Sequence, residues 1–355
     1  MARSRKVVSG DKETELRLSV IIPTYNGKGR IKHTLDALFS QDYPEEFEIV
    51  VVDDGSNDGT ASFVQEYHEK IRVISQPNQG PAVARNLGAR RATGEIILFT
   101  DDDCIPQPNW LREMSRLFAE DPEIVGVKGR YRSEQPSLIA RFVQLEYEDK
   151  FDYMLKEKYI DFIDTYSAGF KREVFLELGG YDTEFPVACA EDVELSYRLW
   201  QKNYKMVFNP AAIVTHTHPD RWWFYLKKKF KFAYWRVIAV KKNPHKLIKD
   251  SHTPQLMKLQ LLFPPFCLAS LPLGVFSAKM LTVSLFGFIF FGLTTIPFTR
   301  KALRKDRTLG WLSPLLLFCR AAAQFAGVAG GMLYLIRQGS AKTAPLSAKV
   351  TQGEK

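Results

Sequence analysis

Short apolar runs alternate with amphipathic segments in the first part of the chain. Residues 18–22 (LSVII) form an apolar run, and the following segment, 32–41, places Leu35, Leu38 and Phe39 on one helical face. The same succession repeats downstream, with apolar runs at 47–54, 71–76 and 95–100 and helical patterns at 60–70 and 80–92. Strands this apolar are buried on both faces, which predicts an α/β fold with a parallel sheet covered by helices.

After about residue 110 the pattern becomes mixed. Residues 109–120 and 191–203 have the spacing of amphipathic helices, and residues 123–131 resemble a strand. Residues 205–219 (KMVFNPAAIVTHTHP) predict one or two short strands that close the polar region.

Two long apolar segments follow. Residues 259–276 and 280–298 contain no charged side chain, are 18 and 19 residues long, and are separated only by the tripeptide SAK. Each is about long enough to cross a hydrocarbon core of ~30 Å, so they predict two transmembrane helices. A pair of buried core helices is the alternative.

A third apolar segment, 309–336, is interrupted only by Arg320. Its Ala323, Gly327 and Gly331 share one helical face at four-residue spacing, which favours close helix packing. A third crossing would put the C-terminus outside. Arg320 leaves alternatives to a full crossing. The segment could be a re-entrant or interfacial helix, or the arginine could face a polar cavity or a lipid phosphate. The basic loop before this segment (RKALRKDR) indicates a cytoplasmic position by the positive-inside rule.

The charge of the chain is concentrated in one segment. The 355 residues carry a formal net charge of +9, and residues 219–258 alone hold eleven Lys or Arg against two Asp. In residues 221–242 these cations interleave with aromatic residues, which is typical of a helix at the headgroup level of a membrane. Nucleic-acid binding is the rival interpretation, but next to apolar spans we expect a membrane and no nucleic acid.

The four cysteines (Cys104, Cys189, Cys267 and Cys319) are scattered without metal-binding spacing, which favours a reducing, cytosolic environment over a disulfide framework. The N-terminus has no apolar core and predicts a flexible tail, not a secretory signal. The expected organisation is a tail at 1–16, an α/β domain at 17–218, a juxtamembrane helix at 219–258, a membrane region at 259–337 and a tail at 338–355.

Three polar clusters follow the ends of the predicted strands. They are residues 24–26, the pair Asp53 and Asp54, and the triplet from Asp101 to Asp103. In parallel sheets ligands bind beyond the carboxyl ends of the strands, so the three clusters predict one site. Three adjacent carboxylates repel one another and require a cation or strong hydrogen-bond donors.

The motifs SVIIPTYNG, VVDDGSNDGT, NQGPAVARNLGARRATGEIILFTDDDC, TYSAGFKREVFLELGGYDTEF and AEDVELSYRLW occur here in order over residues 18–218. Together they resemble the family 2 glycosyltransferases, inverting enzymes of the Rossmann-like GT-A fold that use nucleotide-diphosphate sugars. The resemblance implies that the first loop and the second acidic pair hold the nucleoside of the donor. The corresponding donor-binding positions are Pro23, Thr24, Tyr25, Asn26, Asp53, Asp54, Arg85, Asp101 and Asp102.

Some of these residues also have a purely structural interpretation. The segment DDGSNDGT is a typical turn and helix cap, so Asp53 or Asp54 would bind the donor while Ser56 or Asp58 caps. Arg85 resembles the family's basic residue near the donor, and a solvated helix face is its alternative.

The acidic triplet matches the family's DxD motif, which fixes the register as Asp101-x-Asp103. Residues two apart in an extended segment point to the same side, so Asp102 would point elsewhere. The resemblance implies a divalent cation, Mg²⁺ or Mn²⁺, between these carboxylates and the diphosphate. The expected metal ligands are Asp103, Asp101 and His216, with His218 as the second choice for the histidine.

Glu191 and Asp192 resemble the acidic pair with which the family deprotonates the acceptor. Inversion is a single displacement in which a carboxylate removes a proton from the attacking oxygen. We expect Asp192 to be the base and Glu191 to assist it or to contact the acceptor. Acidic residues in a first helical turn also stabilise the helix dipole, which is the structural alternative.

The QxxRW motif of processive polysaccharide synthases is absent, and DRWW at 220–223 does not replace it. The sequence therefore favours a membrane-bound, metal-dependent enzyme that moves one sugar from a UDP-sugar, or a GDP-sugar, to a lipid or lipid-linked acceptor at the cytoplasmic membrane. The catalytic domain would be cytoplasmic. A small processive synthase and a non-catalytic membrane scaffold that binds nucleotide sugar are the alternatives, and the sequence does not define the oligomeric state.

Overall fold

The computed structural model describes residues 16–185, 190–242 and 253–342. Cys189, the segment 243–252 of the predicted juxtamembrane region, and most of both predicted tails lie outside the described residues. At the C-terminal side the last described helix continues to Lys342, which is beyond the predicted end of the membrane region at residue 337.

The secondary structure follows the predicted alternation in the first hundred residues and adds elements afterwards. The strands among the described residues are β1 (Leu18–Thr24), β2 (Phe47–Asp53), β3 (Ile71–Ser75), β4 (Ile96–Phe99), β5 (Ile105–Pro106), β6 (Ile124–Arg132), β7 (Ala168–Lys171) and β8 (Lys205–Thr215). The helices are α1 (Ile31–Phe39), α2 (Thr60–Tyr67), α3 (Pro81–Arg91), α4 (Trp110–Glu120), α5 (Leu138–Met154), α6 (Arg172–Glu177), α7 (Glu191–Gln201), α8 (Trp222–Lys242), α9 (Gln255–Gln260), α10 (Phe263–Leu273), α11 (Ala278–Lys305) and α12 (Arg307–Lys342).

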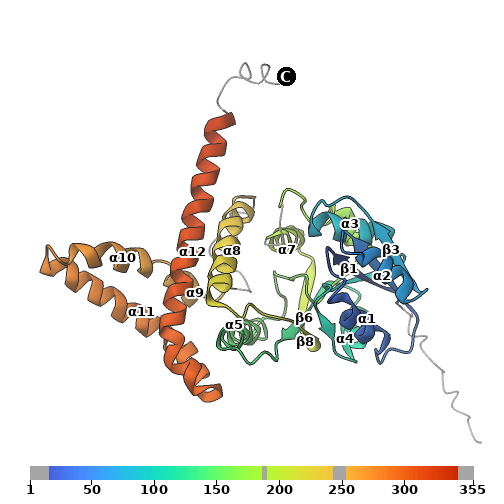
Figure 1. Ribbon diagram of the computed structural model, residues 1–355, viewed down its shortest axis with the longest axis horizontal. Coiled ribbons are helices and arrows are strands. Elements are labelled where there is room, and N and C mark those ends of the chain that lie inside the picture. The colour runs from blue at the N-terminus through green and yellow to red at the C-terminus, as the bar shows by residue number, and fades with distance from the viewer. Residues whose placement is uncertain (1–15, 186–189, 243–252, 343–355) are drawn as a thin grey trace, which may run out of the picture.

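The strands form one sheet in the order β3-β2-β1-β4-β7-β6-β8-β5 (Figure 1). The predicted parallel arrangement is confirmed for β1 to β4, which pair with one another in parallel. The sheet as a whole is mixed, because β7 runs antiparallel between β4 and β6. The pattern of short apolar runs could not reveal this insertion, since a buried antiparallel strand has the same composition as a parallel one.

The parallel half of the sheet supplies the rigid base of the domain. Every residue of β1 is buried, and so is every residue of β4. Helix α3 approaches β1 closely at Gly88, where a Cβ atom would lie 2.4 Å from Cγ2 of Ile21. Because the strands are fixed in this way, the loops at their carboxyl ends are held in place on the same edge.

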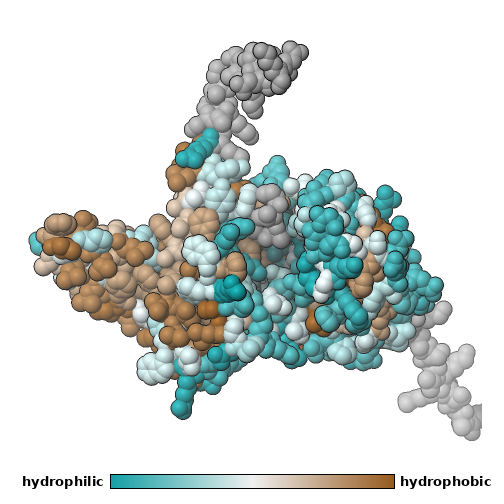
Figure 2. All heavy atoms as spheres, in the orientation of Figure 1, coloured by the Kyte–Doolittle hydropathy of each residue, from teal (hydrophilic) through white to brown (hydrophobic). Residues whose placement is uncertain are grey.

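Three helical segments are long and apolar enough to cross a membrane, namely 255–273, 278–305 and 307–337. Helices α10 and α11 form a hairpin that projects away from the sheet domain, and its surface is largely hydrophobic (Figures 1 and 2). At the tip of the hairpin, Val275 and Phe276 are 82% and 89% exposed. Helix α12 crosses this hairpin steeply and does not run parallel to it (Figure 1).

The predicted small-residue face of α12 packs against α8. A Cβ atom on Gly327 would lie 2.3 Å from the carbonyl oxygen of Phe230, and one on Gly331 would lie 2.6 Å from that of Tyr234. The absence of side chains at these positions therefore permits direct backbone contact between the two helices. Helix α8 keeps an exposed face as well, on which Trp223 and Phe224 are 72% and 54% exposed.

Arg320 is buried in a polar junction between the helical region and the sheet domain. Its Nη1 atom lies 2.9 Å from Oε1 of Glu146 on α5, and its Nη2 atom donates to Gln260 on α9. Lys229 of α8 lies 2.9 Å from Oε2 of the same glutamate. The cation that interrupts the third apolar segment thus has a protein partner, and the interpretation that it contacts lipid phosphate is not needed.

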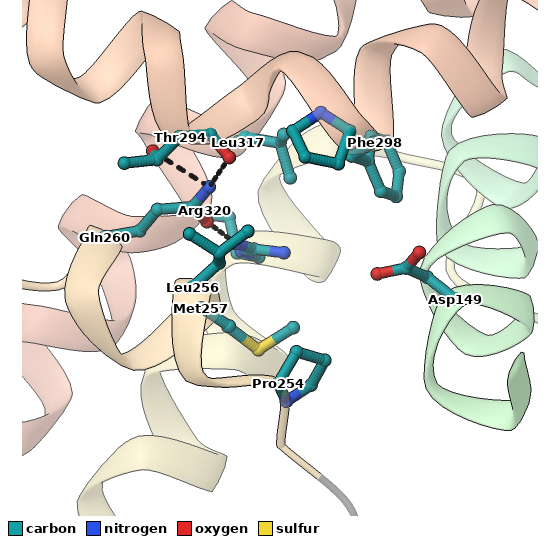
Figure 3. Close-up of a pocket in the computed structure, with 10 residues that line it drawn as sticks. Asp149, Pro254, Leu256, Met257, Gln260, Thr294, Phe298, Leu317 and Arg320 are labelled. Atoms are coloured by element: carbon teal, nitrogen blue, oxygen red, sulfur yellow. Dashed lines mark hydrogen bonds between the residues drawn. The ribbon is translucent and has the colours of Figure 1, made fainter. Parts of the chain in front are cut away.

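A small cavity of about 60 Å³ adjoins this junction (Figure 3). It is lined by Arg320, Asp149 and Gln260 together with apolar side chains of α9, α11 and α12. With polar side chains in its lining, the cavity is suited to hold ordered water next to Arg320.

The predicted basic loop at 300–307 is helical instead, because α11 continues to Lys305 and α12 begins at Arg307. This junction of the two helices is bound to the sheet domain. Lys301 forms an ion pair with Asp152 of α5 at 2.6 Å, Arg141 of α5 pairs with Asp306 at 2.5 Å, and Lys305 pairs with Glu148. The basic end of α11 therefore lies on the same side of the apolar hairpin as the sheet domain.

Candidate active site

The three aspartates of the acidic triplet follow β4 and point to three different partners. Asp101 accepts a hydrogen bond from Arg85 at 2.7 Å, and Asp102 accepts one from Thr24 at 2.6 Å. Asp103 lies 3.6 Å from Nδ1 of His216. Asp102 has a partner apart from its neighbours, but Asp101 and Asp103 also have different partners, because residues 102 and 103 form a turn and not the extended segment that the prediction assumed. The convergence of Asp101 and Asp103 on one ligand stays a prediction.

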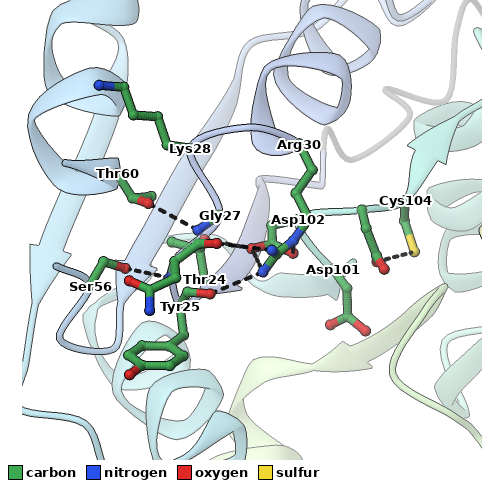
Figure 4. A network of polar contacts seen from close by, with 12 residues as sticks. Thr24, Tyr25, Gly27, Lys28, Arg30, Ser56, Thr60, Asp101, Asp102 and Cys104 are labelled. Carbon is green, nitrogen blue, oxygen red and sulfur yellow. Dashed lines mark hydrogen bonds and ion pairs between the residues drawn. The ribbon is translucent and has the colours of Figure 1, made fainter. Parts of the chain in front are cut away.

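Asp102 organises the loop after β1 (Figure 4). Its two oxygens accept hydrogen bonds from Nε and Nη2 of Arg30 at 2.7 and 2.9 Å, and Arg30 also donates to the carbonyl oxygens of Tyr25 and Asn26. Arg30 was missed in the sequence, because a single arginine at the start of a helix carries no signal of its partner 72 positions away.

The conformation of this loop leaves Tyr25 at the surface, 46% exposed. Asn26 adopts a left-handed backbone conformation with φ of 48°, and its backbone N–H donates to Oγ of Ser56. Gly27 follows, where a Cβ atom would lie 2.2 Å from Oγ1 of Thr24. The loop is therefore held in one shape, with an exposed aromatic ring at its edge.

Asp53 and Asp54 at the end of β2 have different roles in the fold. Asp54 accepts hydrogen bonds from the side chain of Gln76 and from the backbone amides of Gln79 and Gly80, at 2.7 to 2.9 Å. Asp53 accepts one from the amide of Ser56, whereas its buried Oδ1 atom has no hydrogen-bond partner among the described residues. The carboxylate oxygen of the pair that is left without a partner therefore belongs to Asp53.

The prediction that Ser56 or Asp58 caps the next helix is wrong, because Gly59 is the N-cap residue of α2 and has no side chain to do so. Asp58 precedes it, and its Oδ1 atom accepts a hydrogen bond from the backbone amide of Thr60 at 3.0 Å.

Arg85 connects the acidic triplet to the first turn of α7. Its guanidinium is 2% exposed, and its Nη1 atom lies 3.3 Å from Oε1 of Glu191 while Nη2 binds Asp101. Burial alone would lower the pKa of Arg85, but the charges of Asp101 and Glu191 raise it overall. The alternative of a solvated helix face is wrong for Arg85, and Glu191 faces the triplet.

Asp192, next to Glu191, is surrounded by other acidic groups. Burial is the main cause that raises the pKa of Asp192 above its usual range, and the negative charges of Glu191 and Asp164 add to it. Asp164 is itself paired with the buried Lys128 at 2.5 Å. A carboxylate with a raised pKa in such a position is a stronger base than an ordinary aspartate.

Asp103, Cys104 and His216 form the one cluster of potential metal ligands found among the described residues, with ligand atoms within 4.8 Å of one another. Burial raises the pKa of Cys104 well above its ordinary value, so its thiol stays protonated. Aspartate and histidine are ligands that a divalent cation such as Mn²⁺ accepts. Asp101 is outside this cluster, and its role as a metal ligand stays a prediction.

His218, the second choice for a ligand, points away from the triplet. Its Nε2 atom lies 3.0 Å from Oε1 of Gln144, and its ring stacks on Tyr147 of α5. Burial is the main cause that lowers its pKa to about 3, so the ring is neutral. The geometry therefore favours His216 of the two histidines.

Comparison with known proteins agrees with this arrangement. The family model described as "Glycosyl transferase family 2" matches residues 19–179. The chain is 30% identical over 224 residues to glycosyltransferase AglE of Haloferax volcanii, in an alignment that covers 60% of this chain and 71% of AglE. The chain belongs to the family 2 glycosyltransferases.

This glycosyltransferase is also similar to relatives of different lengths. It is 30% identical over 232 residues to the probable glycosyltransferase YdaM of Bacillus subtilis, covering 61% of this chain but only 54% of YdaM. The mannosyltransferase PcManGT from Pyrobaculum calidifontis, solved in complex with GDP-Man and Mn²⁺, superposes with a TM-score of 0.62 at 23% identity. That superposition covers 92% of this chain and 90% of PcManGT, and it confirms the predicted GT-A fold.

Proposed function

We propose that the protein is an inverting glycosyltransferase that moves one sugar from a nucleotide-diphosphate sugar to an acceptor at a membrane. The observation that carries this proposal is the buried chain of ion pairs from Asp101 through Arg85 to Glu191. It fixes the first turn of α7, and with it Asp192, against the loop that bears the acidic triplet. A base and a candidate metal site are thereby held on one edge of the sheet.

The donor would lie across the loops that follow β1 and β2. The unpartnered Oδ1 atom of Asp53 can accept a hydrogen bond from an N–H of the base or a hydroxyl of the ribose. The exposed ring of Tyr25 can stack on the base. UDP is the favoured nucleotide, and the GDP-Man in the structure of PcManGT supports GDP as the other candidate.

Asp103 and His216 would hold Mg²⁺ or Mn²⁺, with Asp101 as a further ligand if it leaves Arg85. The ion, when bound, would neutralise the diphosphate and stabilise the departing nucleotide. The Mn²⁺ in PcManGT supports this assignment.

Asp192 would accept the proton of the acceptor hydroxyl as its oxygen attacks the anomeric carbon opposite the diphosphate. If the attacking group is the phosphate of a lipid, that group is already ionised at neutral pH, and the demand on Asp192 is smaller. Glu191 would then act mainly by keeping Arg85 and Asp101 in position.

A membrane-bound acceptor agrees with the position of the helices. The segment 255–273, which contains α9 and α10, would cross the bilayer together with α11, since its 19 residues span about 28 Å and the 28 residues of α11 span about 42 Å. The exposed aromatic residues of α8 would then lie at the headgroup level. The lipid or lipid-linked acceptor would thus meet the active site beside α8.

The steep crossing of α12 over the hairpin supports an interfacial position for α12, with two crossings instead of three (Figure 1). The C-terminus would then be on the same side as the sheet domain. A tag at the C-terminus, tested with proteases in sealed vesicles, would be cut from the opposite side if α12 spans the membrane.

The activity can be tested with the full chain in detergent, supplied with UDP- and GDP-sugars, Mn²⁺ or Mg²⁺, and polyprenyl phosphate or a lipid extract. Mass spectrometry identifies the product and its number of sugars, so that a processive synthase would reveal itself by long products. We expect Asp192→Asn to abolish transfer to a hydroxyl acceptor and to slow transfer to polyprenyl phosphate less, whereas the exposed control Glu66→Gln should leave both unchanged. Donor binding without any turnover would instead support a scaffold.

A further inference from the structure

The cations of α8 face different surroundings. Lys229 pairs with Glu146, and Lys242 pairs with Asp182 and Glu184, so these two are neutralised within the protein. Lys227 and Lys231 are exposed. These lysines of α8 therefore fall into two groups, one paired with carboxylates of the protein and one exposed to the surroundings.

Lys228 differs from all of these. Its side chain is half-buried, and it forms no ion pair with a carboxylate of the described residues. Its contacts are the hydroxyl of Tyr166 at 3.4 Å and the rings of Tyr166 and Phe232, whose centroids lie 5.9 and 5.6 Å from Nζ. A partly desolvated ammonium without a negative partner is costly, which indicates that a ligand supplies the charge.

The position of Lys228 connects α8 with the acidic triplet. The ring of Tyr166 packs against that of His216, with centroids 4.4 Å apart, and His216 adjoins Asp103. Burial is the main cause that lowers the pKa of Lys228, with Lys229 adding to it, whereas Asp103 and Asp101 oppose the shift. The ammonium is thus connected through Tyr166 to His216 and lies within electrostatic reach of the triplet.

We propose that Lys228 is a phosphate-binding residue of this active site, whose ammonium pairs with a non-bridging phosphate oxygen of a ligand that reaches the acidic triplet. The inference rests on the function proposed above. Two ligands carry the required group, the diphosphate of the donor and the phosphate of a lipid acceptor. With a divalent ion on Asp103 and His216, a diphosphate keeps excess negative charge, and Lys228 is the nearby cation of α8 left to neutralise it.

The test compares Lys228→Met with Lys227→Met in the full chain. Methionine keeps a long apolar side chain and removes only the charge, and Lys227 is the exposed neighbour on the same helix. Lys228→Arg restores the charge and serves as the rescue variant. Equal melting temperatures of the three variants verify that the fold is unchanged.

Two readouts distinguish the two phosphate sources. Binding of UDP and GDP, against UMP and GMP, is measured by calorimetry with Mn²⁺, and transfer to polyprenyl phosphate is measured at varied acceptor concentration. If Lys228 binds the donor, Lys228→Met weakens binding of the diphosphates about tenfold or more and leaves the monophosphates less affected. If it binds the acceptor, nucleotide binding is unchanged and the KM for polyprenyl phosphate rises by a similar factor.

Equal behaviour of Lys228→Met and Lys227→Met in both assays, with an active wild-type chain, would overturn this inference alone. A wild-type chain that neither binds these nucleotides nor transfers a sugar would instead overturn the proposed function, and this inference with it.

Discussion

Arg85 and Glu191 form a buried ion pair, with 3.3 Å between Nη1 and Oε1, although 106 positions separate them in the chain. The same guanidinium binds Asp101 at 2.7 Å. One side chain of α3 thereby fixes the relative position of the acidic triplet and of the helix that carries Asp192.

Arg85→Lys should lower the transfer rate about 100-fold, because a lysine cannot hold both carboxylates in the geometry of a planar guanidinium, and small misplacements of a base are costly. The measurement is kcat with saturating donor and acceptor. Arg90→Lys is the matched control, since Arg90 is exposed on the same helix. Full activity of Arg85→Lys would show that the bridge does not position the base.

Asp103→Ala and Asp102→Ala should have different defects. Asp103→Ala should abolish the Mn²⁺-dependent activity, because it removes the carboxylate next to His216. Asp102→Ala should lower the melting temperature, because it leaves Arg30 and Thr24 without their shared partner in the loop after β1. Metal titrations and thermal unfolding of both variants test this. If Asp102→Ala loses more of the Mn²⁺-dependent activity than Asp103→Ala, the assignment of the DxD motif to Asp101 and Asp103 is wrong.

Transfer to a hydroxyl acceptor should rise with pH through the raised pKa of Asp192. A base acts in its deprotonated form. A raised pKa therefore moves the acidic limb of the pH–rate profile to a higher pH than the value near 4 that is usual for an aspartate. Glu191→Gln removes a neighbouring negative charge and should move that limb to lower pH. An unchanged limb in Glu191→Gln would indicate that another group titrates.

Glu146→Gln should destabilise the junction between α5, α8 and α12. Burial alone would raise the pKa of Glu146, but the charges of Lys229 and Arg320 lower it to about 2. The ion pairs of Glu146 therefore stabilise the fold fully at pH values above 4.5, the ordinary pKa of a glutamate, and this stabilisation is lost as the pH falls toward 2. Breaking such a buried pair costs about 3–5 kcal/mol.

The readout for Glu146→Gln is the melting temperature in detergent at neutral pH, with the exposed Glu157→Gln as control. An equally stable Glu146→Gln chain would show that the pair does not hold the junction together.

Gly327→Ala should lower the melting temperature, because the added Cβ atom would meet the carbonyl oxygen of Phe230 at 2.3 Å and force α8 and α12 apart. Gly292→Ala in α11 is the control, since a Cβ atom there meets nothing within 4 Å. Equal melting temperatures of both variants would contradict the close packing of α8 and α12.

The local pattern of the chain was sufficient for the four parallel strands and for the acidic clusters at their ends. It was not sufficient for β7, whose buried segment of four residues carries no sign of its direction. The distinction between Asp53 and Asp54 was equally hidden, because adjacent aspartates have the same chemistry until the partners of each are known.

The sequence by itself determined the elements, the apolar helices and the residue types of the site, because burial and chain periodicity act over a few residues and can be recognised without tertiary contacts. Only the tertiary structure decided that Arg85 is buried between Asp101 and Glu191 and that Arg320 meets Glu146. It also decided that Lys228 contacts Tyr166, whose ring packs against His216. Ion pairs and desolvation depend on groups that are distant in the chain, and no local pattern contains those distances.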